Sequence, residues 1–224
     1  MKAGNSTYTK LSDLPETVPL FPLSGALLLP AGNMPLNIFE PRYLAMIDDA
    51  MATNSIVGMI QPQFNDQEDS SDAEALCSIG CLGRITAYQE SGDGRLMVNL
   101  AGVCRFRLAD ELEEQNGYRV GRVAGFSDDL LDSDDAAQAV DRDGLLTTFR
   151  QFLEANEMEA DWDGIREAST ETLVNTLSMM SPYGPAEKQA LLEAPDLKTR
   201  SETLVAITEV MLAREAGDSS GTLQ

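Results

Sequence analysis

Three cysteines, Cys77, Cys81 and Cys104, are the most reactive side chains in this sequence of 224 residues, which contains no histidine. A thiol becomes a nucleophile when a neighbouring base or cation stabilises the thiolate, and Arg105 directly after Cys104 could lower the pKa of that thiol. No imidazole is present to act as a general base, and three cysteines complete neither an even set of disulfides nor a tetrahedral metal site. The pattern therefore favours buried, reduced thiols and a cytoplasmic protein.

The other residue types used in catalysis lack the spacing that their chemistry requires. None of the four lysines follows a glycine, which excludes a P-loop, and no serine stands three residues before a lysine. Residues 217–221 have the letters of a Gly-x-Ser-x-Gly nucleophile motif, but they lie in a polar segment and have no histidine partner.

Glu40 is the carboxylate best placed for a chemical role, because it lies between Phe39 and Pro41 at the start of a predicted helix. Its structural alternatives are to complement the dipole of that helix or to pair with Arg105 or Arg107. We favour a structural role and expect no enzymatic activity, no cofactor and no metal. A hydrolase built on a carboxylate or cysteine site is the least favoured function.

The formal net charge is −21, and residues 127–224 carry 21 Asp and Glu against 7 Lys and Arg. Such a surface repels phosphate backbones, so nucleic acid is not an expected partner. Two acidic segments, residues 65–74 and 127–135, lack the pattern of a calcium-binding loop and are predicted to be solvated loops. The densest apolar stretch, Leu20 to Leu29, is interrupted by proline, serine and glycine, so we expect no membrane span. Residues Met1 to Leu14 are polar, so we expect no secretory signal.

The first 126 residues are predicted to form short β-strands separated by glycine and proline. Residues 91–94 (SGDG) are the strongest hairpin signal, since they join two runs of β-forming residues. One helix is predicted from Pro41 to about Ala52, because proline suits a first helical position and apolar residues follow at helical spacing. Many short strands with tight turns indicate a small barrel or a folded-over sheet. The predicted strands are Val18–Leu23, Ala26–Leu29, Met34–Ile38, Ile56–Gln61, Ile79–Glu90, Arg95–Leu108 and Tyr118–Phe126.

From Ala136 onward the pattern is helical. A further helix is predicted from Ala186 to Ala194, and Asp196 is expected to be the N-cap of a last helix that ends near Glu215. Two apolar stripes need packing partners: Leu145, Leu146, Phe149, Phe152 and Leu153, and then Leu173, Val174, Leu177 and Met180. The predicted organisation is a β-rich domain (1–126), an acidic linker (127–135), a helical bundle (136–216) and a disordered tail (217–224).

Several segments, taken in order, resemble the N-terminal, substrate-binding domain of Lon proteases. The resemblance spans about residues 17–213 and is carried by the collinear order of its segments; residues 37–43 (NIFEPRY) are similar to a segment typical of free-standing members. The other similar segments are Val18–Leu23, Leu27–Pro30, Met34–Leu36, Ile79–Ile85, Asp93–Arg95, Leu100–Arg107, Pro185–Glu193 and Asp196–Leu197.

This resemblance implies an α+β fold, in which a twisted, PUA-like β-barrel with one helix precedes a helical bundle. It also implies a non-catalytic module that binds other proteins or extended peptide segments, with a separate ATP-dependent protease as a further expected partner. The ATPase and peptidase domains of full-length Lon are expected to be absent. The candidate partner-binding residues are Phe39, Arg42, Tyr43 and Arg105, for which core and turn roles are the structural alternative. A small-ligand sensor using a cleft between barrel and bundle is the alternative function.

Overall fold

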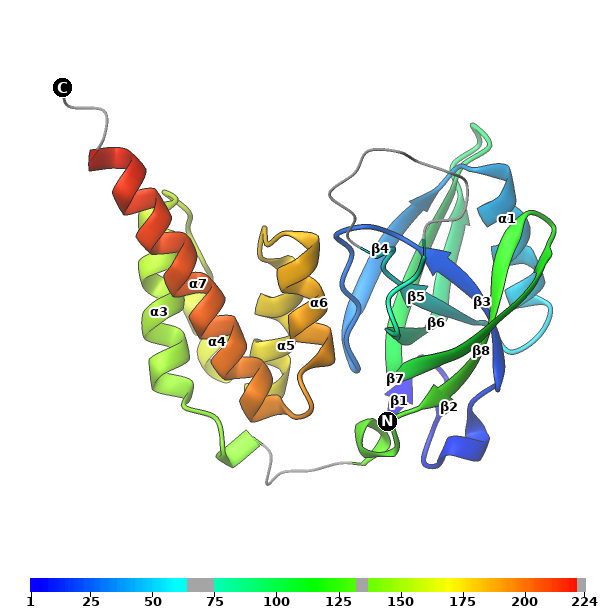
Figure 1. The fold of residues 1–224 in the computed structure, drawn as a ribbon, viewed down its shortest axis with the longest axis horizontal. Helices are drawn as coiled ribbons and strands as arrows, with labels where there is room; N and C mark the ends of the chain where they lie inside the picture. Colours follow the sequence, from blue (N-terminus) through cyan, green and yellow to red (C-terminus); the bar gives the residue numbers. More distant parts are fainter. Residues whose placement is uncertain (64–74, 132–136, 221–224) are drawn as a thin grey trace. The chain divides into compact units, whose positions relative to one another are not determined.

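The computed structural model of the chain describes residues 1–63, 75–131 and 137–220, the last six of these by their backbone alone. The chain divides into two compact units, which are described separately. Residues 1–132 and 182–192 form the first unit, and residues 133–181 and 193–224 form the second. The first is rich in β-strands and the second is helical (Figure 1), which confirms the predicted α+β fold class.

The β-rich unit contains a six-stranded sheet in the order β4-β7-β6-β5-β3-β8. Because β8 also pairs with β7, the strands β7, β6, β5, β3 and β8 close into a ring, and β4 extends the sheet along the first part of β7 (Figure 1). Every pair is antiparallel except β3 with β5. The strands are β3 (Thr17–Pro22), β4 (Asn33–Ile38), β5 (Ile56–Ile60), β6 (Ile79–Glu90), β7 (Leu96–Gln115) and β8 (Tyr118–Gly125), preceded by a small hairpin of β1 (Lys2–Ala3) and β2 (Ser6–Thr7).

Strand β7 makes the closure possible because it is long enough to serve two neighbours on one edge. Its first part, Leu96–Ala101, pairs with β4, and its later part, from Phe106 to Gln115, pairs with β8. Between these parts the register with β6 shifts, which leaves Val103 as an extra residue. A bulge of this kind bends a strand and increases its twist, as a closed barrel requires.

Helix α1 (Pro41–Met51) lies against β3, β5 and β8. Glu40 is its N-cap, Pro41 is its first residue, and its buried residues recur at helical spacing, which confirms the helix predicted from Pro41. The hydroxyl of Tyr118 donates a hydrogen bond to Asp49 Oδ2 at 2.8 Å, which ties the end of α1 to the start of β8.

The segment predicted as a strand from Ala26 to Leu29 is a loop instead. Its three leucines are buried, so the apolar pattern is correct, but its backbone follows a turn rather than a ladder. The amide of Gly32 donates a hydrogen bond to Leu29 O. Gly102 in β7 holds the end of the loop with two further bonds: its carbonyl accepts from Ala31 N, and its amide donates to Gly32 O. A short apolar run has no periodicity that separates a buried strand from a buried loop.

The helical unit contains α3 (Arg142–Ala155), α4 (Trp162–Glu167), α5 (Thr170–Met180) and α7 (Leu197–Ser220). Helix α7 lies beside α3 and α5 (Figure 1). The predicted stripes are largely buried, but Met180 has 80% of its surface exposed. Asp196 accepts a hydrogen bond from Thr199 N at 2.7 Å, as expected of an N-cap. The last helix runs to Ser220 rather than to about Glu215, and residues 221–224 lie outside the described part of the chain.

Helix α6 (Pro185–Glu193) lies between α5 and α7 in the sequence but, up to Leu192, belongs to the β-rich unit. The buried side chain of Gln61 donates to Pro185 O and to Gln189 Oε1, both at 3.1 Å, and it accepts from Gly25 N at 2.9 Å. Gln189 in turn donates to Ile79 O at 3.1 Å. Because a buried amide without partners is costly, these bonds specify where α6 packs against the strands.

The acidic segment that begins at Ser127 is not a solvated loop throughout. Residues Ser127–Leu130 form a short 3-10 helix, η2, in which Leu130 is buried in the barrel core and Asp129 is also largely buried. Residues 65–74 and 132–135 of the two predicted acidic loops lie outside the described residues.

Candidate functional site

Phe39 is the most exposed of the candidate residues, with 62% of its surface accessible in the short connection between β4 and α1. The guanidinium carbon of Arg95 lies 5.9 Å from the centre of its ring, which is within the range of a cation–π contact. An exposed phenylalanine supported on one side by a cation offers its other surface to an apolar ligand.

A groove of about 340 Å³ lies between α1 and the β6–β7 hairpin. Arg95 lines this groove and also contacts Phe39, so the aromatic ring adjoins it. The lining combines apolar and charged side chains: Leu44 and Asp48 come from α1, and Glu90, Gly92, Gly94, Arg95 and Leu96 come from the hairpin. Such a groove can accept one apolar side chain while charged groups at its rim contact polar atoms of the same ligand.

Arg42 and Tyr43 follow Phe39 in the first turn of α1 but differ in exposure. Arg42 is about half exposed, its guanidinium bonds Glu40 at 2.9 Å, and its Cζ lies 4.7 Å from the centre of the Tyr43 ring. Tyr43 is buried against Phe21, with 4.5 Å between ring centres, and this burial raises the pKa of its hydroxyl. Glu40 thus pairs with Arg42, and not with Arg105 or Arg107, which was one of the two structural alternatives for it.

Arg105, the fourth candidate, is buried in β7 and does not join this group. Its guanidinium forms a two-pronged ion pair with Asp129, with Nη2 to Oδ1 at 2.7 Å and Nε to Oδ2 at 2.9 Å. Its Nη1 also donates to Leu192 O in α6 at 3.3 Å. Arg105 therefore connects β7, η2 and α6, which corresponds to the core role that was the structural alternative to partner binding.

The sequence did not identify the groove beside Phe39. Its lining comes from α1 and from a hairpin about forty residues further along the chain, and no local pattern relates the two. The available signal was Asp93-Gly94-Arg95, which resembled a family segment and which places Arg95 at the groove.

The thiol of Cys104 has the environment of a core residue rather than of a nucleophile. It is fully buried, and burial, together with the negative charge of Asp129, raises its pKa to about 12 despite the adjacent Arg105. Its Sγ donates to Phe126 O at 3.2 Å. The hypothesis that Arg105 activates this thiol is therefore wrong, because desolvation outweighs the attraction of the cation.

We expect Cys104 in the native protein to resist alkylation by iodoacetamide at pH values up to about 10. Because both burial and the raised pKa suppress the thiolate, its rate should be at least about 100-fold below that of the urea-unfolded chain. Mass spectrometry of peptides after timed labelling measures the rate, with Cys77 as an internal comparison. Labelling of Cys104 as fast as in the unfolded chain would contradict this assignment.

Within the described ranges, no group of three or more His, Cys, Asp or Glu side chains is arranged to hold a metal ion. None of the helices in the described part of the chain has the length and apolar character needed to cross a membrane.

The chain was compared with protein families and with curated proteins. Residues 17–209 match the model of the ATP-dependent protease La (LON) substrate-binding domain. Lon protease 2 of Myxococcus xanthus is 26% identical over 87% of the chain, and the Lon protease of Parabacteroides distasonis is 29% identical over 86%. In both cases the match covers 24% of the relative, so the chain spans about a quarter of the length of these proteases.

Solved structures give the same fold. A Lon N-terminal domain protein from Xanthomonas campestris is 26% identical, with a TM-score of 0.60, and the match covers 85% of this chain and 97% of that one. The N-terminal domain of Lon protease from the Mycobacterium avium complex has a TM-score of 0.62 and 20% identity, and the match covers 86% of this chain and 98% of that one. This second likeness supports the fold alone.

Proposed function

The chain belongs to the family of ATP-dependent protease La (LON) substrate-binding domains, and from this premise we propose that it is a non-catalytic module that binds exposed, extended segments of other proteins. The observation that carries the proposal is the exposed Phe39 beside the groove between α1 and the β6–β7 hairpin. Exposed aromatic residues beside a pocket are typical anchors of protein recognition.

Of the four candidate residues, Phe39 and Arg42 are proposed to contact the partner directly. Tyr43 is proposed to hold the start of α1 in place through its contact with Phe21, and Arg105 to hold the barrel, η2 and α6 together. We also propose that a separate ATP-dependent protease receives the bound segments and that the protein acts in the cytoplasm. The family of the relatives supports the first, and the burial of all three cysteines, which is typical of reduced thiols, supports the second.

Replacing Phe39 by alanine is expected to weaken binding of an extended apolar peptide by about tenfold, because truncation of an aromatic anchor typically costs more than about 1 kcal/mol. The probe is a panel of fluorescein-labelled, uncharged peptides of about twelve residues in which apolar and polar residues alternate. A second panel replaces the apolar residues by serine. Fluorescence anisotropy with the full chain measures the affinities.

Leu131→Ala is the matched control, because Leu131 is 64% exposed in the same unit but does not line the groove. It should change the affinity by less than about twofold. Equal affinities of the Phe39→Ala and wild-type proteins, or equal binding of the apolar and serine panels, would contradict the proposed function.

A further inference from the structure

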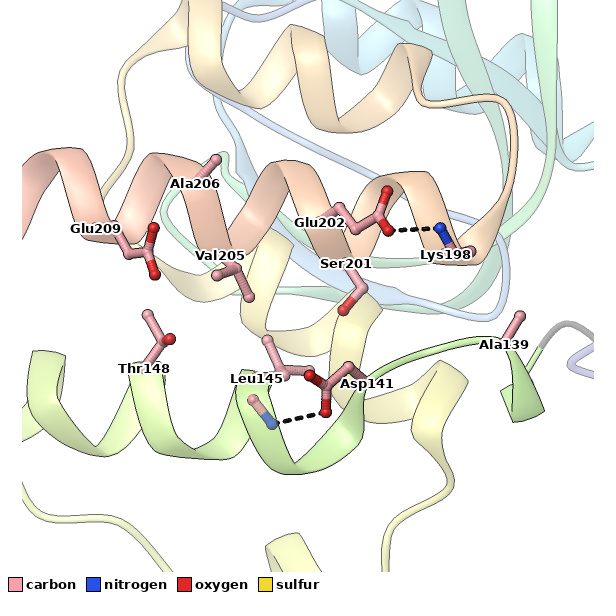
Figure 2. Close-up of a pocket in the computed structure, with 11 residues that line it drawn as sticks. Ala139, Asp141, Leu145, Thr148, Lys198, Ser201, Glu202, Val205, Ala206 and Glu209 are labelled. Atoms are coloured by element: carbon pink, nitrogen blue, oxygen red, sulfur yellow. Dashed lines mark hydrogen bonds and ion pairs between the residues drawn. The ribbon is translucent and has the colours of Figure 1, made fainter.

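The helical unit has a groove of its own, between α3 and α7, with a volume of about 490 Å³. Figure 2 shows Val205 and Ser201 of α7 pointing toward Leu145 and Thr148 of α3. The lining residues of α7 recur at helical spacing from Lys198 to Glu209, so one continuous face of that helix borders the groove.

The groove is hollow because the side chains that border it are mostly small. Gly144 and Thr148 on α3 and Ser201 on α7 are too small to fill the space between the two helices. Leu145 is buried and Val205 is half buried, so the bottom of the groove is apolar. Because small residues line the groove and apolar residues form its base, there is room for apolar side chains from another molecule.

The rim of the groove is acidic. Asp141, Glu202 and Glu209 line it, and Lys198 is the one cation among the lining residues and pairs with Glu202. The whole helical unit carries 17 Asp and Glu against 6 Lys and Arg. The field at this groove therefore favours a positively charged occupant.

The groove is about as long as two turns of a helix. From Asp141 to Thr148 the chain advances about 10 Å along α3, which equals the span of residues i, i+3, i+4 and i+7 on one face of a bound helix. We propose that this groove binds a basic amphipathic helix of a partner protein, with its apolar face against Leu145 and Val205 and its Lys or Arg side chains at Asp141, Glu202 and Glu209. This site is independent of the one at Phe39.

A second copy of this chain does not have the required charge. Each of its described helices carries at least as many acidic as basic residues, and α7, which has the most cations, has three against four acids. At a net charge of −21, two copies also repel each other. The chemistry of the groove thus points to a different, basic protein.

The probe is a fluorescent peptide of about fourteen residues with leucine on one helical face and lysine elsewhere, titrated into the full chain at low and at physiological salt. A peptide of the same composition in scrambled order, and one with glutamate in place of lysine, are the reference ligands. Val205→Trp fills the groove, and Glu209→Lys reverses a charge at its rim. Glu154→Lys makes the same charge change on an exposed position of α3 that does not line the groove.

The helical lysine peptide should bind at least about tenfold more tightly than its scrambled form. Val205→Trp should weaken it by at least about tenfold and Glu209→Lys by about threefold to tenfold, whereas Glu154→Lys should change it by less than about twofold. Equal binding of the helical and scrambled peptides, or equal effects of Glu154→Lys and Glu209→Lys, would overturn the proposal in favour of unspecific charge attraction. Preferential binding of the glutamate peptide, or self-association of the chain through this groove, would overturn the choice of occupant.

Discussion

An Asp129→Ala variant is expected to lose about 3–5 kcal/mol of the free energy of unfolding of the β-rich unit, because it leaves the Arg105 guanidinium charged and buried without its counterion. Both side chains are nearly inaccessible, at 5% for Arg105 and 9% for Asp129. The carboxylate also accepts a hydrogen bond from the backbone amide of Arg105 at 2.8 Å, and this bond is lost as well. Urea titration followed by far-ultraviolet circular dichroism measures the change, and the fluorescence of Trp162 reports on the helical unit separately.

The matched control is the exposed ion pair between Arg122 and Asp110, whose side chains are more than half accessible. Asp110→Ala should lower stability by less than about 0.5 kcal/mol, because water and salt already screen that pair. The double variant Arg105→Met, Asp129→Leu should recover much of the loss, since it removes the buried charge instead of isolating it. If Asp129→Ala were as mild as Asp110→Ala, Arg105 would have to reach water after the substitution, and its role in holding η2 and α6 would be contradicted.

The regular elements of the fold were predictable because their signals are local. Strand β6 has the predicted bounds, Ile79–Glu90, and helix α1 begins at the predicted Pro41. Strand alternation and helix-start residues are read within a few neighbouring positions, so no knowledge of distant partners is needed. The family resemblance added the order of these elements, and the match of residues 17–209 to the family model confirms that resemblance.

The later part of β7 could not be predicted in this way. The strand was expected to end at Leu108, but it continues to Gln115 through a run of acidic residues that have low strand propensity. In the structure these residues pair with β8, where Arg122 and Arg119 bond Asp110 and Glu111 across the strands. Pairing with β8 outweighs local propensity here, and it depends on a partner strand that a sequence window does not show.

The candidate partner-binding residues were only partly predictable, because their burial also depends on distant parts of the chain. The segment around Phe39, Arg42 and Tyr43 was identified by resemblance, but its division into exposed and buried residues depends on what packs against it. Arg105 was a candidate for partner binding with a core role as the alternative, and it pairs with Asp129, which lies 24 residues away in a segment interpreted as solvated. A charged residue in a strand says nothing by itself about whether a distant counterion will bury it.

Gly102→Ala is expected to destabilise the β-rich unit by about 3–5 kcal/mol, because a methyl group at this position has no space. A Cβ there would lie 2.0 Å from the carbonyl oxygen of Leu29 and 2.8 Å from its carbonyl carbon. That carbonyl cannot move away easily, since it accepts from Gly32 N at 2.9 Å, and Gly32 O in turn accepts from Gly102 N at 2.8 Å. Urea titration by circular dichroism measures the loss.

Gly92→Asn is the matched control, because the two glycines are needed for different reasons. A Cβ at Gly92 would meet nothing within 4 Å, and the residue is required only for its positive φ of +81°. Asparagine tolerates this left-handed conformation, so the variant should lose less than about 1 kcal/mol. A mild effect of Gly102→Ala would mean that the loop of residues 27–32 can lift away from β7 at little cost. Since Leu27, Leu28 and Leu29 belong to that loop and are all buried, lifting it would expose them to water, and a severe effect is therefore the expected result.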